Sequence, residues 1–199
     1  GWAGQMTEKI SAPEPIHLIN PHWYMHDANW FLDFPTSAEK VNLLYQKSGA
    51  PSADGVIAIT ATVMQKLLEL TGPIEMTEYG LTVTADNFYE TTQYEVEFNY
   101  DKEENEPKKF ITDLTPIVIE KTLALQKDKW PALLNLFLEM TKEKQIMMYF
   151  DNYELEKKVV EMGMGGEIKN TTGDYLSVVS SNLGGGKTDH VVKQKIDHQ

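Results

Sequence analysis

Two short apolar runs constrain the fold of this 199-residue chain more than any other feature. The runs Gly55–Ile59 and Gln145–Phe150 are bounded by turn residues and are flanked by helical patterns. Continuous apolar runs of this length are typical of strands buried on both faces of a sheet. We therefore expect an α/β fold, with one domain over residues 1–199 and a mixed central sheet that has helices on both faces.

Local end signals predict the two helices around the first run. Thr36 and Glu39 have the spacing of a capping box, and the helix that they open is expected to end at Gly49. Thr60 follows the first apolar run and is expected to cap the next helix, which ends before Gly72.

Helical patterns continue in the second half of the chain. Residues 107–143 contain two of them, and residues 152–163 contain an amphipathic third. Pro116 is expected to kink the first helix or to split it after Leu114, because proline removes one backbone hydrogen bond. Pro131 suits the first position of the second helix.

The rest of the chain predicts strands and loops. Residues 1–13 are expected to form an irregular lead-in, and residues 15–20 a short strand. Residues 74–84 predict a hairpin. The tail predicts two more strands, 175–180 and 190–196, with a glycine-rich connection between them.

Charge and composition exclude several classes of function. The chain has 18 lysines, no arginine and 30 acidic residues, for a net charge of −12. This balance argues against nucleic acid or an anionic lipid surface as a partner. Without arginine there is no bidentate recognition of phosphate, and without cysteine there is no thiolate chemistry. No apolar run is long enough to span a bilayer, and the start at Gly1 suggests a piece of a longer protein.

The aromatic loop between Pro21 and Pro35 contains candidate site residues. Asp27, Asn29 and Asp33 supply the hard oxygen atoms that Mg²⁺ or Ca²⁺ prefer, although the loop lacks the glycine and the closing glutamate of a calcium loop. The alternative is that these side chains only make turn and capping hydrogen bonds. Asp33 is expected to cap or brace the helix after Pro35 and to point back toward the loop.

Histidines and glycines in two loops resemble known motifs without meeting their requirements. His22 and His26 have the spacing of a helical zinc pair but lack the glutamate of a zinc peptidase, so they are expected to be ordinary loop residues. The stretch 183–188 ends in Gly-Lys-Thr, but Ser181 occupies the position where a phosphate-binding loop needs glycine. A hairpin loop is expected there, with Lys187 and Asn182 as candidate functional groups.

The two loops together predict one working surface. Function in open α/β sheets concentrates in loops at one edge of the sheet. The predicted rim consists of Asp27, Asn29, Asp33, Asn182, Lys187 and Asp189.

Several sequence strings in this order resemble one bacterial family. They are HDANWFLDFPTSAEK, DGVIAITATVMQKLLELTGPIEM, QYEVEF followed by PKKFITDL, and SSNLGGGKTDH. They resemble domain of unknown function 4012, from about Trp23 to the C-terminus. The resemblance implies a membrane-spanning anchor upstream and a location outside the cytoplasm, on the cell envelope, but no established biochemical role.

A second, more distant similarity is to the LytR-CpsA-Psr cell-wall ligases. The strand, helix and turn of DGVIAITATVMQKLLELTGPIEM look like theirs, which implies a LytR-CpsA-Psr-like fold. Those enzymes transfer glycopolymers from a polyprenyl pyrophosphate to peptidoglycan, and arginines hold the pyrophosphate. In this chain, Lys108 and Lys109 stand at the matching position, and a lysine lacks the planar fork.

Two functional hypotheses follow. The first is an extracytoplasmic domain that binds or scaffolds envelope glycopolymers without catalysis and without a cofactor. The second is a metal-assisted glycopolymer phosphotransferase, in which Mg²⁺ at Asp27 and Asp33 replaces the missing positive charge and Lys187 or Lys108 contacts the phosphate.

Overall fold

Two compact units make up the chain in the computed structural model, which describes residues 6, 8–100, 106, 108–174, 176–179, 192–193 and 195–197. Unit 1 comprises residues 1–56, 149–156 and 166–199, and unit 2 comprises residues 57–148 and 157–165. The chain therefore passes from one unit to the other several times. The expectation of one domain stays a prediction.

Unit 1 begins with a short helix where a strand was expected. Residues 15–20 were predicted to be extended, but α1 spans Glu14–His17 and the backbone N–H groups of Ile19 and Asn20 both donate to the Ile16 carbonyl. Pro15 lies in the first helical turn, where its fixed φ and missing N–H favour a helix. Of the apolar residues here, only Ile16 is buried, which explains why no strand pattern is realised.

Helix α2, Phe34–Lys47, is the main helix of unit 1. The capping box at Thr36 was a wrong prediction, because the N-cap is Asp33 and Pro35 occupies the second helical position. Beside α2 lies the short 3-10 helix η2, Met25–Asp27. The core of this unit consists of Ala12, Ile16, Trp23, Ala28 and Leu44.

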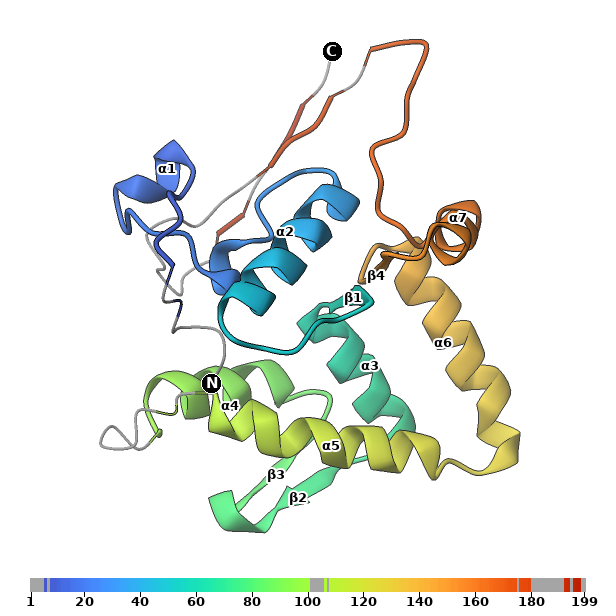
Figure 1. Cartoon of the computed structure of the whole chain (residues 1–199). Coiled ribbons are helices and arrows are strands. Elements are labelled where there is room, and N and C mark those ends of the chain that lie inside the picture. The colour runs from blue at the N-terminus through green and yellow to red at the C-terminus, as the bar shows by residue number, and fades with distance from the viewer. Residues whose placement is uncertain are drawn as a thin grey trace. The chain divides into compact units, whose positions relative to one another are not determined.

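Unit 2 contains most of the helices. Its elements are α3 Ala61–Thr71, β2 Ile74–Met76, η3 Thr77–Tyr79, β3 Leu81–Val83, α4 Phe88–Glu97, α5 Lys109–Leu123, η4 Lys127–Lys129 and α6 Trp130–Lys142 (Figure 1). The expected hairpin is confirmed, since β2 and β3 pair antiparallel with Glu75 opposite Thr82. Thr60 occupies the N-cap position of α3 as expected, but its side chain makes no capping hydrogen bond and its hydroxyl donates to Gln145 Oε1 instead. Gly72 ends this helix with φ 82°.

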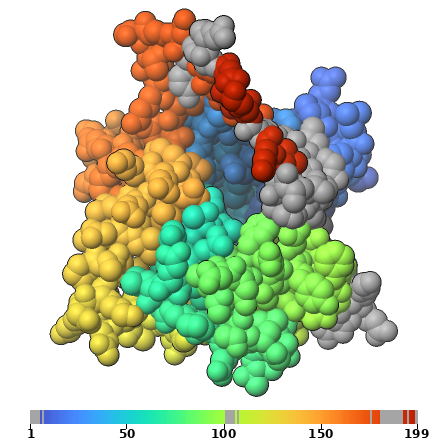
Figure 2. Space-filling model, turned by 180° about the vertical axis from the view of Figure 1, so that it is seen from behind, coloured from blue at the N-terminus to red at the C-terminus, as the bar shows by residue number. Residues whose placement is uncertain are grey.

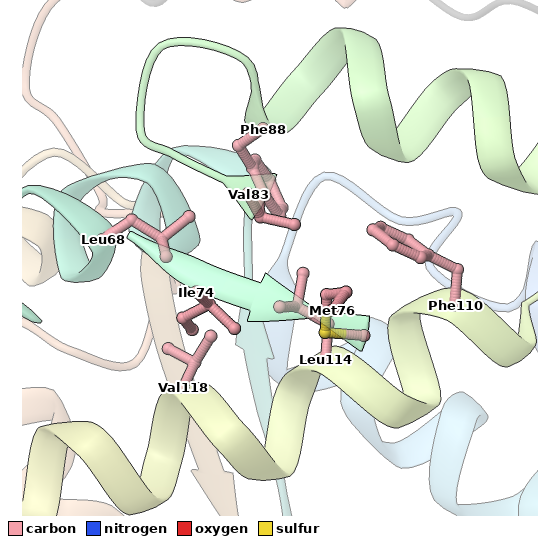
Figure 3. Close-up of a cluster of buried hydrophobic side chains, with 8 residues drawn as sticks. All are labelled: Leu68, Ile74, Met76, Val83, Phe88, Phe110, Leu114 and Val118. Atoms are coloured by element: carbon pink, nitrogen blue, oxygen red, sulfur yellow. The ribbon is translucent and has the colours of Figure 1, made fainter. Parts of the chain in front are cut away.

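One hydrophobic cluster joins α3, the hairpin, α4 and α5 (Figure 3). Burial of apolar surface at this junction supplies the main stabilisation of unit 2. The cluster consists of Leu68, Ile74, Met76, Val83, Phe88, Phe110, Leu114 and Val118.

Helix α5 continues through its proline. Pro116 lies inside the helix, so the predicted split after Leu114 does not occur. Leu114 and Val118 are both buried in the cluster on either side of Pro116, and this packing compensates for the one backbone hydrogen bond that the proline removes. Pro131 takes the second position of α6 rather than the expected first.

The two apolar runs form the predicted strands and pair with each other. Strand β1 spans Gly55–Ile59 and strand β4 spans Ile146–Phe150. The pairing is antiparallel, since the Thr60 N–H donates to the Gln145 carbonyl at 3.0 Å and the Asp151 N–H donates to the Asp54 carbonyl at 2.9 Å. Helix α7, Tyr153–Glu161, follows β4.

The described residues do not form the expected mixed central sheet with helices on both faces. They form a mostly helical α/β structure with two separate two-stranded sheets. Ile57 and Ile59 of β1 are more than half exposed, so this run is not buried on both faces. Of the predicted tail strands, 175–180 and 190–196, residues 176–179, 192–193 and 195–196 are described and carry no strand, and the remaining residues lie outside the described part of the chain. No helix in the described part of the chain is long and apolar enough to cross a bilayer.

Candidate functional site

The aromatic loop lines an open pocket of about 340 Å³ in unit 1, here named the loop pocket. Two of the predicted site residues, Asp27 and Asn29, lie in its wall. The complete lining is Ile16, Ile19, Asn20, His26, Asp27, Asn29 and Trp30. The pocket therefore presents carboxylate, amide and imidazole groups next to an indole ring.

Trp23 anchors the loop beneath this pocket. Its side chain is buried in the core of unit 1, and its Nε1–H donates to the Asp27 carbonyl at 3.0 Å. The Trp23 backbone N–H donates to the Ile10 carbonyl at 2.8 Å, and Lys40 Nζ lies 5.0 Å from the centroid of the Trp23 ring. These contacts hold the turn that carries His26 and Asp27.

The polar groups of the loop pocket are partly ordered by one another. His26 Nε2 lies 3.1 Å from Asp27 Oδ2, and the Tyr24 ring stacks on the His26 ring with centroids 5.6 Å apart. Asn29 is exposed, and Asp27 and Trp30 are half-buried. This arrangement offers hydrogen-bond donors and acceptors around an accessible aromatic surface.

Asp33 has a structural position outside the lining of the loop pocket. Its Oδ2 accepts hydrogen bonds from the Thr36 hydroxyl at 2.7 Å and from the Thr36 N–H at 3.2 Å, which confirms the predicted cap. Its Oδ1 accepts from the Ile168 N–H at 3.0 Å, so this oxygen binds a distant segment instead of pointing to the aromatic loop. Burial opposes ionisation, but these hydrogen bonds lower the pKa of Asp33 below its usual range.

The expected Mg²⁺ ligands do not fit a metal site. Both oxygens of Asp33 are engaged by protein donors, and Asp27 faces His26. Among the residues that the structure describes, no group of three or more His, Cys, Asp or Glu side chains is placed to hold a metal ion. The loop therefore provides hydrogen bonding rather than a coordination sphere.

Substitution of the cap tests this role of Asp33. Asp33→Ala is expected to lower the free energy of unfolding by about 1 kcal/mol at about pH 7, since a lost N-cap leaves helix donors unpaired. Because the folded pKa of Asp33 is lowered from 3.8, the stabilisation is present above that value and is lost as the pH falls through the folded pKa. Urea unfolding at about pH 7 and about pH 2 measures both effects. The exposed Asp174→Ala is the control, and an equal loss at both pH values would contradict an ionised cap.

The other predicted site residues are not brought to the loop pocket by the described structure. Asn182, Lys187 and Asp189 lie outside the described residues, so the shared rim stays a prediction. Lys108 is the N-cap residue of α5 and Lys109 its first residue, and both belong to unit 2.

Sequence reasoning missed several lining residues of the loop pocket. Asn20 and Ile19 were placed in a strand, and His26 was interpreted as an ordinary loop residue. The one available signal was the proximity of Trp30 to Asp27 and Asn29 within the same polar loop.

Unit 2 contains a further polar pocket, of about 460 Å³, that no sequence motif indicates. In its wall the Tyr79 hydroxyl donates to Asp113 Oδ2 at 2.7 Å, across 34 residues of chain. Burial, and then the hydrogen bond and charge of Asp113, raise the pKa of Tyr79 far above its usual range. Tyr79 therefore stays protonated and acts as a donor that ties the hairpin to α5.

Comparison with known proteins adds one finding about the segment that carries the loop pocket. Residues 5–96 match the family described as "Protein of unknown function (DUF4012)". The DUF4012 match starts earlier than the expected Trp23 and ends before α5, so it covers less than half of the chain. It includes the HDANWFLDFPTSAEK and DGVIAITATVMQKLLELTGPIEM strings, but not PKKFITDL or SSNLGGGKTDH.

The other comparisons do not extend the DUF4012 finding. No curated protein and no solved structure matches the chain. The expected similarity to the LytR-CpsA-Psr ligases therefore has no support from these comparisons.

Proposed function

We propose that this chain is an extracytoplasmic domain of the cell envelope that binds envelope glycopolymers in the loop pocket. The observation that carries the proposal is the combination of Trp30 with Asp27 and Asn29 in one open pocket. The apolar face of a sugar ring packs on an indole, while its hydroxyl groups pair with carboxylate and amide groups. A pocket of about 340 Å³ suits one or two residues of a longer glycan.

Charge indicates which class of glycan the loop pocket binds. The wall of the loop pocket contains the carboxylate of Asp27, which repels polymers that are rich in phosphate or carboxylate. The lining of the loop pocket likewise contains no lysine that could pair with an anion. We therefore expect a neutral glycan backbone to bind better than an anionic phosphate polymer.

The proposed location rests on the family resemblance, which implies an anchor upstream of this domain. In the full-length protein, protease added outside intact cells stripped of their wall is expected to cleave this domain. Protection of the domain until the membrane is permeabilised would contradict an extracytoplasmic location.

The alternative, a metal-assisted phosphotransferase, gains no support from the loop. Its proposed ligand Asp33 is engaged as a helix cap, and its proposed phosphate contact Lys108 belongs to unit 2, whereas the proposed ligands belong to unit 1. Binding without catalysis is therefore the better-supported proposal.

Two substitutions in the loop pocket test glycan binding. Trp30→Ala and Asp27→Asn are each expected to weaken binding to isolated peptidoglycan about tenfold, a loss of about 1.4 kcal/mol. The measurement is co-sedimentation with peptidoglycan before and after acid extraction of its attached polymers. Retained binding after extraction identifies the backbone glycan as the ligand, and lost binding identifies the attached polymer.

The matched control is Tyr153→Ala, which removes an exposed aromatic ring of unit 1 outside the pocket. It is expected to bind like the unsubstituted protein. Equal binding by all three variants would refute the loop pocket as the glycan site.

A further inference from the structure

Helix α6 has an apolar stripe that faces solvent. Its buried side is centred on Met140, as expected for a helix packed against a core. Trp130, Leu134 and Leu138, however, are 49%, 58% and 49% exposed. Residues spaced by four lie on one helix face, so these three form a continuous apolar stripe.

An apolar groove adjoins this stripe within unit 2. It has a volume of about 440 Å³ and lies between α3, α6 and the end of α5. Val63 and Leu67 of α3 form one wall, while Trp130 and Leu134 belong both to the groove and to the exposed stripe. Figure 2 shows α3 and α6 side by side, in teal and in yellow to gold. Apolar side chains thus continue from the groove to the surface.

Lysines gather where α5 meets α6. Residues 121–138 contain Lys121, Lys127 and Lys129 but only one acidic residue, Asp128, in a chain whose net charge is −12. Lys121 Nζ donates to the Pro73 carbonyl at 2.7 Å and Lys129 Nζ donates to the Leu70 carbonyl at 3.2 Å. Both ammonium groups are therefore held at the C-terminal end of α3.

These lysines have no carboxylate partner among the described residues. The pKa of Lys66 of α3 is raised chiefly by Glu69, with smaller contributions from Glu139 of α6 and from Glu143 at its C-cap. On the helix wheel Glu139 and Glu143 lie about 100° or more from Leu134 and Leu138.

Trp130 is fixed at the junction of the apolar and basic groups. Its indole Nε1–H donates to the Leu125 carbonyl at 3.1 Å, which satisfies the polar atom of the ring while half of the side chain stays exposed. Leu123, at the end of α5, is exposed as well. We name this surface, made of Leu123, Lys127, Lys129, Trp130, Leu134 and Leu138, the α6 corner.

We propose that the α6 corner docks on the surface of an anionic phospholipid bilayer. The leucine stripe enters the boundary between headgroups and acyl chains, the Trp130 ring lies at the headgroup level, and the lysine ammonium groups pair with lipid phosphates. This interaction does not depend on glycan binding in unit 1.

Charge complementarity favours a bilayer over a second copy of the chain. Two copies joined through their α6 corners would bring two lysine clusters together, whereas an anionic bilayer attracts each cluster by about 1 kcal/mol per lysine. The net charge of −12 predicted no binding to an anionic surface, but charges beyond a Debye length of about 8 Å are largely screened. The local positive charge therefore decides the contact, and docking is weak and reversible.

Vesicle flotation with the whole chain tests the proposal. Vesicles of phosphatidylcholine with about one-third phosphatidylglycerol are expected to bind the protein, and vesicles of phosphatidylcholine alone are expected to bind it at least about tenfold more weakly. Leu134→Asn combined with Leu138→Asn is expected to lower the partition coefficient about tenfold, which equals about 1.4 kcal/mol. Lys127→Glu is expected to have a similar effect that fades at about 0.5 M salt.

Matched controls are available on the same unit. Phe98→Asn removes an exposed apolar ring from the end of α4, and Lys157→Glu reverses an exposed lysine of α7. Both are expected to leave vesicle binding unchanged. Circular dichroism checks folding, and Leu138→Asn alone replaces the double variant if the latter loses helical signal.

Three results would overturn the proposal. The first is binding that is equal for anionic and neutral vesicles. The second is binding that the α6 variants do not weaken. The third is a dimer in sedimentation that dissociates when Leu134 and Leu138 are changed and that does not bind vesicles, which would make a second copy the occupant.

Discussion

Gly55→Ala is expected to lower the free energy of unfolding by about 3 kcal/mol, and Gly55→Val is expected to leave little folded protein. A Cβ atom at Gly55 would lie 2.3 Å from the Tyr149 carbonyl oxygen and 2.7 Å from Phe150 Cδ1. The carbonyl belongs to the backbone of β4 and can move only if the pairing of β1 with β4 changes. Chemical unfolding of the purified variants measures the loss.

The control for this prediction is a glycine at which an added Cβ atom would contact no other atom. A Cβ atom at Gly173 would meet no atom within 4 Å, so Gly173→Ala is expected to leave stability nearly unchanged. If Gly55→Ala were as stable as Gly173→Ala, the close approach of β1 to β4 would be wrong.

Leu114→Ala is expected to lower the free energy of unfolding by about 2 to 5 kcal/mol. Leu114 is 1% exposed and lies in the cluster that joins α5 to α3 and the hairpin, so the truncation leaves a cavity that these elements cannot easily fill. Urea unfolding followed by far-ultraviolet circular dichroism measures the change, because unit 2 contains most of the helices.

Ile111→Ala on the same helix provides the comparison. Ile111 is 40% exposed, so its truncation is expected to cost about 1 kcal/mol or less. Similar losses for both variants would mean that α5 does not present the Leu114 side to the core.

Sequence reasoning succeeded where the determining signals are local. The strands β1 and β4, the hairpin and helix α3 follow from apolar runs, caps and turn residues that lie within each element. It failed where tertiary packing overrides a local signal. The cluster residues around Pro116 keep α5 continuous. At α2 a second local signal decides instead, because Pro35 at the second helical position fits an N-cap at Asp33 rather than at Thr36.

The same distinction between local and long-range signals applies to the residues of the candidate site. Asp27 and Asn29 were predicted from the polar character of one loop, and both line the loop pocket. Asn20 and Ile16 reach that pocket only because residues 14–17 form a helix instead of the expected strand. The contact between Asp33 and Ile168 spans 135 residues, and no local pattern can reveal it.

The division of unit 1 among three chain segments has a consequence for the order of events during synthesis. The Asn42 side chain donates a hydrogen bond to the carboxylate of Asp151, 109 residues later, and Asp33 accepts a hydrogen bond from the Ile168 N–H, 135 residues later. At roughly 10 residues per second, the first segment leaves the ribosome about ten seconds before these partners exist. The contact between Tyr79 and Asp113 in unit 2 spans only 34 residues. The helices of unit 2 therefore assemble while unit 1 is still incomplete. A chain that is released after residue 148 lacks the later segments of unit 1 that Asn42 and Asp33 contact.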